Sequence, residues 1–281
     1  MSRIRRGWAL TKKSWSLLRS HPGLLRFPLY GAAASILATL VVVGPGLYLI
    51  DSSSTGPGVV LLAVGLYLLT LVGLYFSVGL AAAADMTFRG REASVGDGLA
   101  VSRERFGAIA GWAAVSTAVG VVLSLLEDQG GIGGAIFGRV LDIGWSLITF
   151  LAVPVIALEG TGPFETLKRS ASMFRDRWGQ QVTGNLAIGG AVLLLGVLPG
   201  IALVAGGIAI WASSGFAGAV LVIVGVVVLA VAMVLSRALS GIFGVALYRY
   251  AVGGESVGGF TTTEFESVVR RKRGGSEPAT I

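Results

Sequence analysis

Apolar residues along this chain gather in long continuous runs that short polar segments separate. About twenty consecutive apolar residues, each rising about 1.5 Å in a helix, cross the hydrocarbon core of a bilayer. Six runs reach that length, covering residues 27–50, 58–84, 106–126, 136–158, 182–211 and 216–236, and the last continues as helix to about Tyr250. The pattern predicts an all-α polytopic membrane helical bundle with six transmembrane helices.

The composition fits the same class. Of the 281 residues, 54% are hydrophobic and 13% are charged, whereas about a quarter are charged in an average soluble domain. The mean hydropathy is +0.80, and the 43 glycines suit transmembrane helices that approach one another closely. We expect one transmembrane domain over residues 1–252 and a flexible basic cytoplasmic tail over 253–281.

Basic residues are distributed unevenly between the runs. Seven Lys or Arg precede the first run, four follow the second, four follow the fourth and five follow the sixth, which places 20 of the 22 basic residues in alternate loops. The positive-inside rule assigns those loops to the cytoplasm. We therefore expect a multi-pass protein of the cell membrane with both termini in the cytoplasm. Anionic lipid head groups, and not nucleic acid, are the expected partner of the basic surface.

A short charged motif stands before each odd-numbered run. It reads RERFG at 103–107 and RDRWG at 175–179, and the first copy is RSHPG at 19–23. The copies predict three parallel units that begin inside the cell. Each unit is an interfacial amphipathic helix followed by a helical hairpin, and the units cover about 3–58, 85–135 and 159–250.

We interpret each copy of the motif as an elbow between the membrane surface and a transmembrane helix. The arginines reach lipid phosphates, the aromatic of the second and third copies lies at the head-group level, and the glycine, Gly107 in the second unit, permits the bend. In the third unit, Phe164, Leu167, Ala171 and Phe174 form an apolar helical face. The candidate lipid head-group contacts are Arg19, Arg103, Arg105, Arg175, Arg177 and Trp178.

Polar residues inside the runs are candidates for an intramembrane site. These residues are Arg139, Asp142, Asn185 and Arg237. Arg139 and Asp142 are three residues apart and can pair on one helical face. Asn185 is interpreted as an interhelical hydrogen-bonding group. Arg237 either marks the cytoplasmic interface or lies deep in the membrane, where it needs a partner such as Asp85 or Glu159.

Small residues and prolines indicate how the helices pack. Three rows with a spacing of four consist of Gly73, Ser77 and Ala81, of Ser116, Gly120 and Ser124, and of Ser236, Ser240 and Gly244. Such rows let helices approach closely within one bundle, with a homo-oligomer or another membrane protein as the alternative partner. Pro45, Pro154 and Pro199 should kink their helices or mark helix ends.

Residues that would carry catalysis or hold a cofactor are scarce. The chain has no Cys and one histidine, His21, so it offers no His pair for zinc. Glu127 and Asp128 are adjacent in an outer loop, which suits solvation better than acid–base chemistry. We expect a non-enzymatic integral membrane protein without a cofactor, whose elbows contact lipids or organise partners. The alternative is a small-solute or lipid transporter with a continuous polar path through the four intramembrane candidates.

Several segments resemble a known family. They are Ser14-Trp15, Leu17-Leu18, His21-Pro22 and Phe27-Pro28 before the first run, and ALYRYA at 246–251 followed by Gly253. With these segments and the repeated elbows, the chain to about residue 260 resembles an uncharacterised six-span prokaryotic membrane-protein family, catalogued as a domain of unknown function. Its layout is also similar to the membrane domain of some glycerophosphodiester phosphodiesterases. The resemblance implies a fold and a membrane location and transfers no active residues.

Overall fold

The computed structural model describes residues 18–51, 55–129, 138, 141–142, 144–146, 148–178, 192–211 and 213–254. All regular secondary structure in these ranges is helical. The helices are η1 (Pro22–Leu25), α2 (Arg26–Ala38), η2 (Thr39–Val43), α3 (Gly44–Asp51), α4 (Thr55–Phe88), α5 (Val95–Glu104), α6 (Phe106–Gln129), α8 (Ala152–Glu159), α9 (Pro163–Trp178), η3 (Leu193–Val197), α11 (Leu198–Ile210) and α12 (Gly215–Gly253).

Five described segments are long and apolar enough to cross a membrane. They are Pro22–Asp51, Gly56–Phe88, Phe106–Leu126, Leu193–Ile210 and Gly215–Gly253. These segments correspond to the first, second, third, fifth and sixth predicted runs, and they confirm the all-α polytopic membrane bundle. The fourth run, 136–158, lies partly outside the described residues, so the number of six spans stays a prediction.

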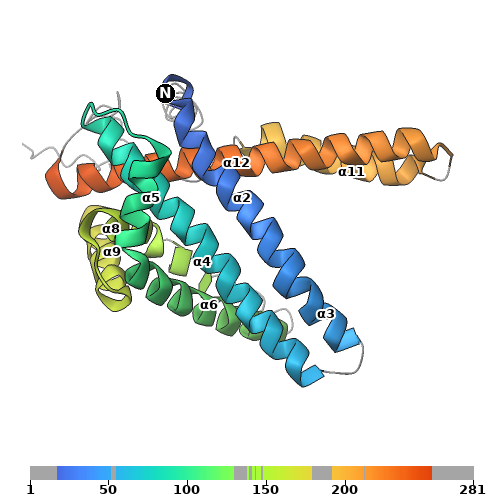
Figure 1. Ribbon diagram of the computed structural model, residues 1–281, viewed down its shortest axis with the longest axis horizontal. Helices are drawn as coiled ribbons and strands as arrows, with labels where there is room; N and C mark the ends of the chain where they lie inside the picture. Colours follow the sequence, from blue (N-terminus) through green and yellow to red (C-terminus); the bar gives the residue numbers. More distant parts are fainter. Residues whose placement is uncertain are drawn as a thin grey trace, which may run out of the picture.

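Helices that follow one another in the chain pair to form arms. In Figure 1 the segment from α2 to α3 lies along α4, α6 lies on another side of α4, and α11 runs along the first part of α12. The α11–α12 arm and the α2–α3 segment point in different directions and diverge from a common region. We call this region, where α4, α8 and α12 end and α5 and α9 begin, the base.

Glycines allow the two helices of an arm to touch. A Cβ atom on Gly207 of α11 would lie 2.7 Å from the carbonyl oxygen of Gly218 in α12, and one on Gly218 would lie 2.8 Å from that of Gly207. Neither position has room for a side chain, so the two backbones are in direct contact. The glycines of the rows predicted from the sequence are less crowded, since a Cβ on Gly73 or Gly244 would lie 3.7 Å from its nearest neighbour and one on Gly120 would meet no described atom within 4 Å.

Two of the three prolines that were expected to kink helices or mark their ends are accommodated in the same way. Pro45 follows the π-helical turn η2, and Pro199 follows the π-helical turn η3. Because proline lacks an N–H and its ring clashes with the carbonyl one turn earlier, the preceding turn widens. Pro154 instead lies in the first turn of α8, where the missing N–H has no intrahelical partner to lose. The prolines thus mark irregular turns or a helix start, as expected.

The buried apolar side chains gather in the base. The largest fully buried ones include Phe27, Ile109, Ile156, Ile242 and Phe243. Outside this region the long helices expose most of their surface, and only 6% to 17% of the residues in their most apolar stretches are buried. The helices of an arm therefore contact mainly each other, and the core lies at the base.

The helices that end at the base share one kind of cap. Gly90 after α4, Gly160 after α8 and Gly254 after α12 have φ angles of 74°, 69° and 68°. This left-handed conformation closes a helix and favours glycine, because a Cβ atom would be strained there. Each cap follows an even-numbered predicted run, so the chain leaves the second, fourth and sixth helices in the same way.

Candidate functional site

Two carboxylates at the base are held by consecutive residues of α12. Asp85 lies in the last turn of α4, and Glu159 is the last residue of α8. Arg249 Nε lies 2.6 Å from Asp85 Oδ1, and the Tyr248 hydroxyl donates a hydrogen bond of 2.7 Å to Glu159 Oε1. One turn of α12 therefore joins the ends of two other helices.

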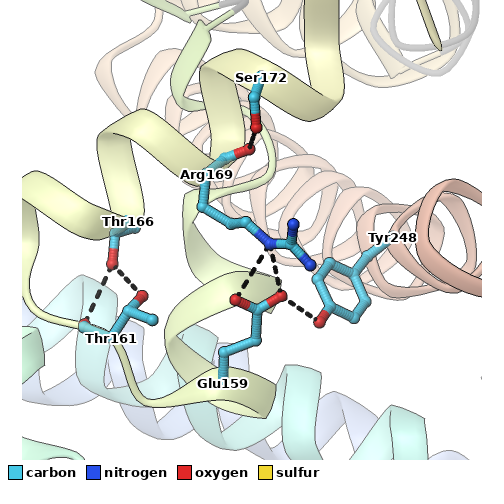
Figure 2. Close-up of polar contacts among 6 residues, drawn as sticks. All are labelled: Glu159, Thr161, Thr166, Arg169, Ser172 and Tyr248. Atoms are coloured by element: carbon cyan, nitrogen blue, oxygen red, sulfur yellow. Dashed lines mark hydrogen bonds and ion pairs between the residues drawn. The ribbon is translucent and has the colours of Figure 1, made fainter. Parts of the chain in front are cut away.

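Each carboxylate also pairs with a more exposed arginine, Arg89 at Asp85 and Arg169 at Glu159. Arg89 Nε lies 2.9 Å from Asp85 Oδ2. Arg169 of α9 places its Nε 3.0 Å and 3.2 Å from the two oxygens of Glu159, as Figure 2 shows. We call these six residues, Asp85, Arg89, Glu159, Arg169, Tyr248 and Arg249, the base cluster.

The start of α9 positions Arg169 for this contact. The Thr166 hydroxyl reaches back to Thr161, bonding its hydroxyl at 2.8 Å and its carbonyl at 3.1 Å, and Ser172 donates to the Arg169 carbonyl at 2.9 Å (Figure 2). The left-handed Gly160 turns the chain directly after Glu159. These local bonds fix the short connection between α8 and α9, so Glu159 and Arg169 face one another across the turn.

The burial of Asp85 determines how much the base cluster contributes to the stability of the fold. Asp85 is 5% exposed, and Arg249 is nearly as well covered, with 13% of its side chain exposed. Removing one partner of such a buried ion pair leaves an uncompensated charge, which costs about 3–5 kcal/mol. Since both carboxylates already accept bonds from side chains of this chain, the cluster suits a structural joint between helices.

The helix of the second elbow packs onto protein and does not lie free on a bilayer surface. α5 runs antiparallel to α4, because Gly98 contacts Gly79 and Ser102 Oγ donates 2.8 Å to the Tyr75 carbonyl. Ser102 is fully buried. At the start of α5, Ser94 and Asp97 form a capping box, and the hydrogen bonds from Ser94 lower the pKa of Asp97.

The third elbow helix, α9, buries hydroxyl residues that the sequence pattern did not single out. Thr166 and Ser170 are fully buried and Met173 is buried on the same side of α9, with Ser170 Oγ donating to the Ile148 carbonyl. Phe164, expected in the apolar face, is 78% exposed. The buried hydroxyls pack tightly because the neighbouring segments offer carbonyl acceptors, and contact of the apolar face with the bilayer stays a prediction.

The RERFG motif is the junction between α5 and α6. α5 ends at Glu104 and α6 begins at Phe106, so Arg105 alone makes the break. Arg105 pairs with Glu104 at 3.5 Å, and Arg103 is exposed. Gly107 lies inside α6 with an ordinary helical conformation. The role given to this glycine in the bend was therefore wrong.

The other predicted contacts are distributed over the base. Arg19 and Arg175 are exposed. Arg177 and Trp178 are in α9, and their side chains lie outside what the structure describes. The base therefore carries predicted lipid-contacting arginines from all three elbows.

The predicted intramembrane residues are only partly visible. Arg139 and Asn185 lie outside the described residues. The predicted pair of Arg139 with Asp142 therefore stays a prediction, and Asp142 itself is partly buried. Arg237 is an exposed residue in the continuous helix α12, beside Gly73 of α4. The partners suggested for Arg237 bind other residues later in the same helix: Asp85 pairs with Arg249, and Glu159 accepts a hydrogen bond from Tyr248.

Comparison with known proteins identifies the family. The chain belongs to the family of unknown function DUF6159, which matches residues 57–260. The matched part runs from α4 to beyond α12 and includes the whole base cluster. No curated protein and no solved structure matches the chain. The likeness in layout to the membrane domain of some glycerophosphodiester phosphodiesterases stays a prediction.

Sequence reasoning missed Tyr248 and Arg249 as site residues. Both belong to the ALYRYA segment, which the sequence offered only as part of a resemblance. A signal was present, because Asp85 and Glu159 each close an even-numbered run and a buried carboxylate there needs a cation. Arg237 was the cation considered. Arg249, twelve residues later on the same helix, is the arginine that pairs with Asp85.

Proposed function

We propose that this is a non-enzymatic integral membrane protein whose base lies at the cytoplasmic face and contacts anionic lipid head groups through the elbow arginines. The observation that carries the proposal is the position of the apolar core. Burial of apolar side chains is favourable where water is the alternative solvent, and lipid offers no such drive between helices. A core confined to the base therefore supports a base outside the hydrocarbon layer.

Helix lengths support the same orientation. From Thr55 to Tyr75 of α4 is about 20 residues, and from Gly215 to Arg237 of α12 is about 22, so both distances are about 30 Å along the helix axis. That is the thickness of the hydrocarbon core. Arg237 then lies at the inner interface, and the later parts of both helices extend through the head groups into the cytoplasm.

The exposed cations lie on this side. Arg19, Arg103 and Arg175 come from three different elbows and are all exposed. Each basic residue near an anionic leaflet contributes about 1 kcal/mol of attraction. Three such residues on a base that the ion cluster holds together would orient the bundle and draw anionic lipid around it.

The rival, a small-solute or lipid transporter, has less support. The buried residues of the described part of the base are mostly apolar, among them Ala81, Ala84, Ile242 and Phe243. An apolar core of this kind suits helix packing. The same elbows could instead bind a protein partner, either a second copy of this chain or another membrane protein.

The proposal is tested by lipid-dependent stability. The purified protein is unfolded in mild detergent with added phosphatidylglycerol or phosphatidylcholine, and the unfolding midpoint is followed by tryptophan fluorescence. We expect phosphatidylglycerol to raise the midpoint more, because a ligand that binds only the folded state stabilises it. A variant in which Arg19, Arg103 and Arg175 are all replaced by Gln should lose the difference. Equal responses to the two lipids in the native protein would contradict the proposal.

A further inference from the structure

An open groove runs along α4 beside the second elbow. It has a volume of 540 Å³ and is lined by Leu71, Val72, Tyr75, Phe76, Arg103 and Phe106. Four of these residues belong to α4, Arg103 belongs to the last turn of α5, and Phe106 is the first residue of α6. The groove is thus an apolar surface groove with one cation in its wall.

The order of residues along the groove has a direction. Ser102 bonds the Tyr75 carbonyl, and Tyr67 bonds the Ala110 carbonyl, so α5 and α6 both run antiparallel to α4. Arg103 therefore lies level with Tyr75, on the side of the base. Phe106 lies nearer Leu71, on the side of the arms. Polarity falls from the base toward the arms, as it does from the head group to the tails of a lipid in the leaflet next to the base.

The charge in the groove is available to a ligand. In the motif, the carboxylate of Glu104 pairs with Arg105. No side chain among the described residues forms a hydrogen bond or ion pair with Arg103, which is exposed. A guanidinium presents several donors in a plane and binds phosphate through paired hydrogen bonds. The Arg103 guanidinium adjoins an apolar groove here, so the complementary ligand has both a phosphate and a hydrocarbon chain.

We infer that this groove binds one anionic phospholipid of the leaflet next to the base, with its phosphate at Arg103 and an acyl chain along Val72 and Leu71. The inference rests on the proposed orientation, in which Tyr75 and Arg103 lie at the inner interface about 30 Å from the outer end of α4. It goes further than surface attraction, because it assigns a single lipid to a defined site.

The test is site-specific photolabelling. The full chain is reconstituted in bilayers of phosphatidylcholine and phosphatidylglycerol in equal parts, with a trace of either lipid carrying a photoreactive group in its acyl chain. Labelled peptides are then mapped by mass spectrometry. Both lipids offer a phosphate to Arg103, but the choline cation of phosphatidylcholine cancels its charge. We therefore expect phosphatidylglycerol to label the segment 71–76 and residue 106 about fivefold more than phosphatidylcholine does, the factor typical of one basic residue facing an anionic lipid.

Three variants decide the outcome. Arg103→Gln, at an exposed position, should reduce labelling by phosphatidylglycerol to the phosphatidylcholine value, and Lys168→Gln, which removes an equal charge from α9, should leave it unchanged. Val72→Trp should fill the groove and abolish the labelling with both lipids, while its unfolding midpoint confirms that it folds. Labelling that Arg103→Gln leaves intact would overturn the inference.

This outcome is separable from failure of the proposed function. If phosphatidylglycerol still stabilises the protein and only the triple replacement of Arg19, Arg103 and Arg175 removes the effect, the base attracts anionic lipid without a site in the groove. If phosphatidylglycerol gives no stabilisation and no preferred labelling, both proposals are wrong.

Discussion

Arg249 Nε lies 2.6 Å from Asp85 Oδ1, although the two residues are 164 positions apart in the chain. Asp85 lies in the last turn of α4 and Arg249 lies near the end of α12, so the pair joins the start of the second predicted unit to the end of the third. Tyr248, the preceding residue, binds Glu159 at the end of α8 in the same way. One turn of the last helix thus holds together three helix ends from different parts of the sequence.

The buried ion pair should make a large contribution to stability. Asp85→Asn leaves Arg249 without its countercharge in a buried position, and the free energy of unfolding should fall by about 3–5 kcal/mol. Denaturant titration in detergent micelles measures this value. The matched control is Arg89→Gln, which removes the other cation at Asp85. Because 60% of the Arg89 side chain is exposed, its effect should stay below about 1 kcal/mol. Equal losses in the two variants would contradict this assignment.

The Tyr248 hydroxyl should matter to the base although it changes no charge. Tyr248→Phe removes the 2.7 Å hydrogen bond to Glu159 and nothing else of the ring. A bond to a charged group contributes about 1.5–3 kcal/mol, and the free energy of unfolding should fall by that amount. Tyr67→Phe serves as the comparison, since its hydroxyl bonds a neutral carbonyl at 3.4 Å and should cost less. A silent Tyr248→Phe would show that Arg169 alone satisfies Glu159.

Two adjacent glycines of α11 should differ sharply in what they tolerate. A Cβ on Gly207 would lie 2.7 Å from the Gly218 carbonyl oxygen, whereas one on Gly206 would meet no described atom within 4 Å. Gly207→Val should therefore force α11 and α12 apart and lower stability by about 1–3 kcal/mol. Gly206→Val should be close to neutral. The unfolding midpoints of both variants in micelles check the contrast, and the reverse order would mean that the arm packs through another face.

The capping box of α5 should respond to acid. The hydrogen bonds from Ser94 hold the pKa of Asp97 below its ordinary value of 3.8. A lowered pKa means that the stabilisation is fully present above pH 3.8 and is lost as the pH falls through the folded-state value. The native protein should therefore be more stable than Asp97→Asn at neutral pH, and the difference in unfolding midpoint should shrink below pH 3.8. A constant difference down to acid pH would exclude the carboxylate as its source.

The sequence predicted the membrane-length helices correctly, because long apolar runs are a local signal. The interpretation of the charged motifs as elbows at the membrane surface stays a prediction. Sequence reasoning failed where the choice depended on a helix face. The transmembrane helices are apolar on all sides, so neither the contact of Gly207 with Gly218 nor the openness of Gly206 is marked in the pattern. The same reason explains the wrong partner for Arg237. Which of two arginines on α12 meets Asp85 depends on how α4 and α12 are aligned along their lengths.

The buried hydroxyls show a second kind of failure. Ser102 and Ser170 lie in segments that read as amphipathic surface helices, yet both donate to main-chain carbonyls of neighbouring segments. A serine carries no signal of its partner, since the acceptor is a backbone group that every residue has. Such contacts become visible only when the two segments are placed side by side.

The central claim, a packed base outside the bilayer on the cytoplasmic side, is tested most directly by cysteine accessibility. The chain has no native Cys, so a single replacement reports one position. Phe164→Cys, at the 78% exposed position of the base, should react with a membrane-impermeant maleimide in inside-out vesicles and stay unlabelled in intact cells. Leu37→Cys, on the lipid-facing side of α2, should react in neither. Labelling of position 164 in intact cells, or its protection in both preparations, would contradict the account.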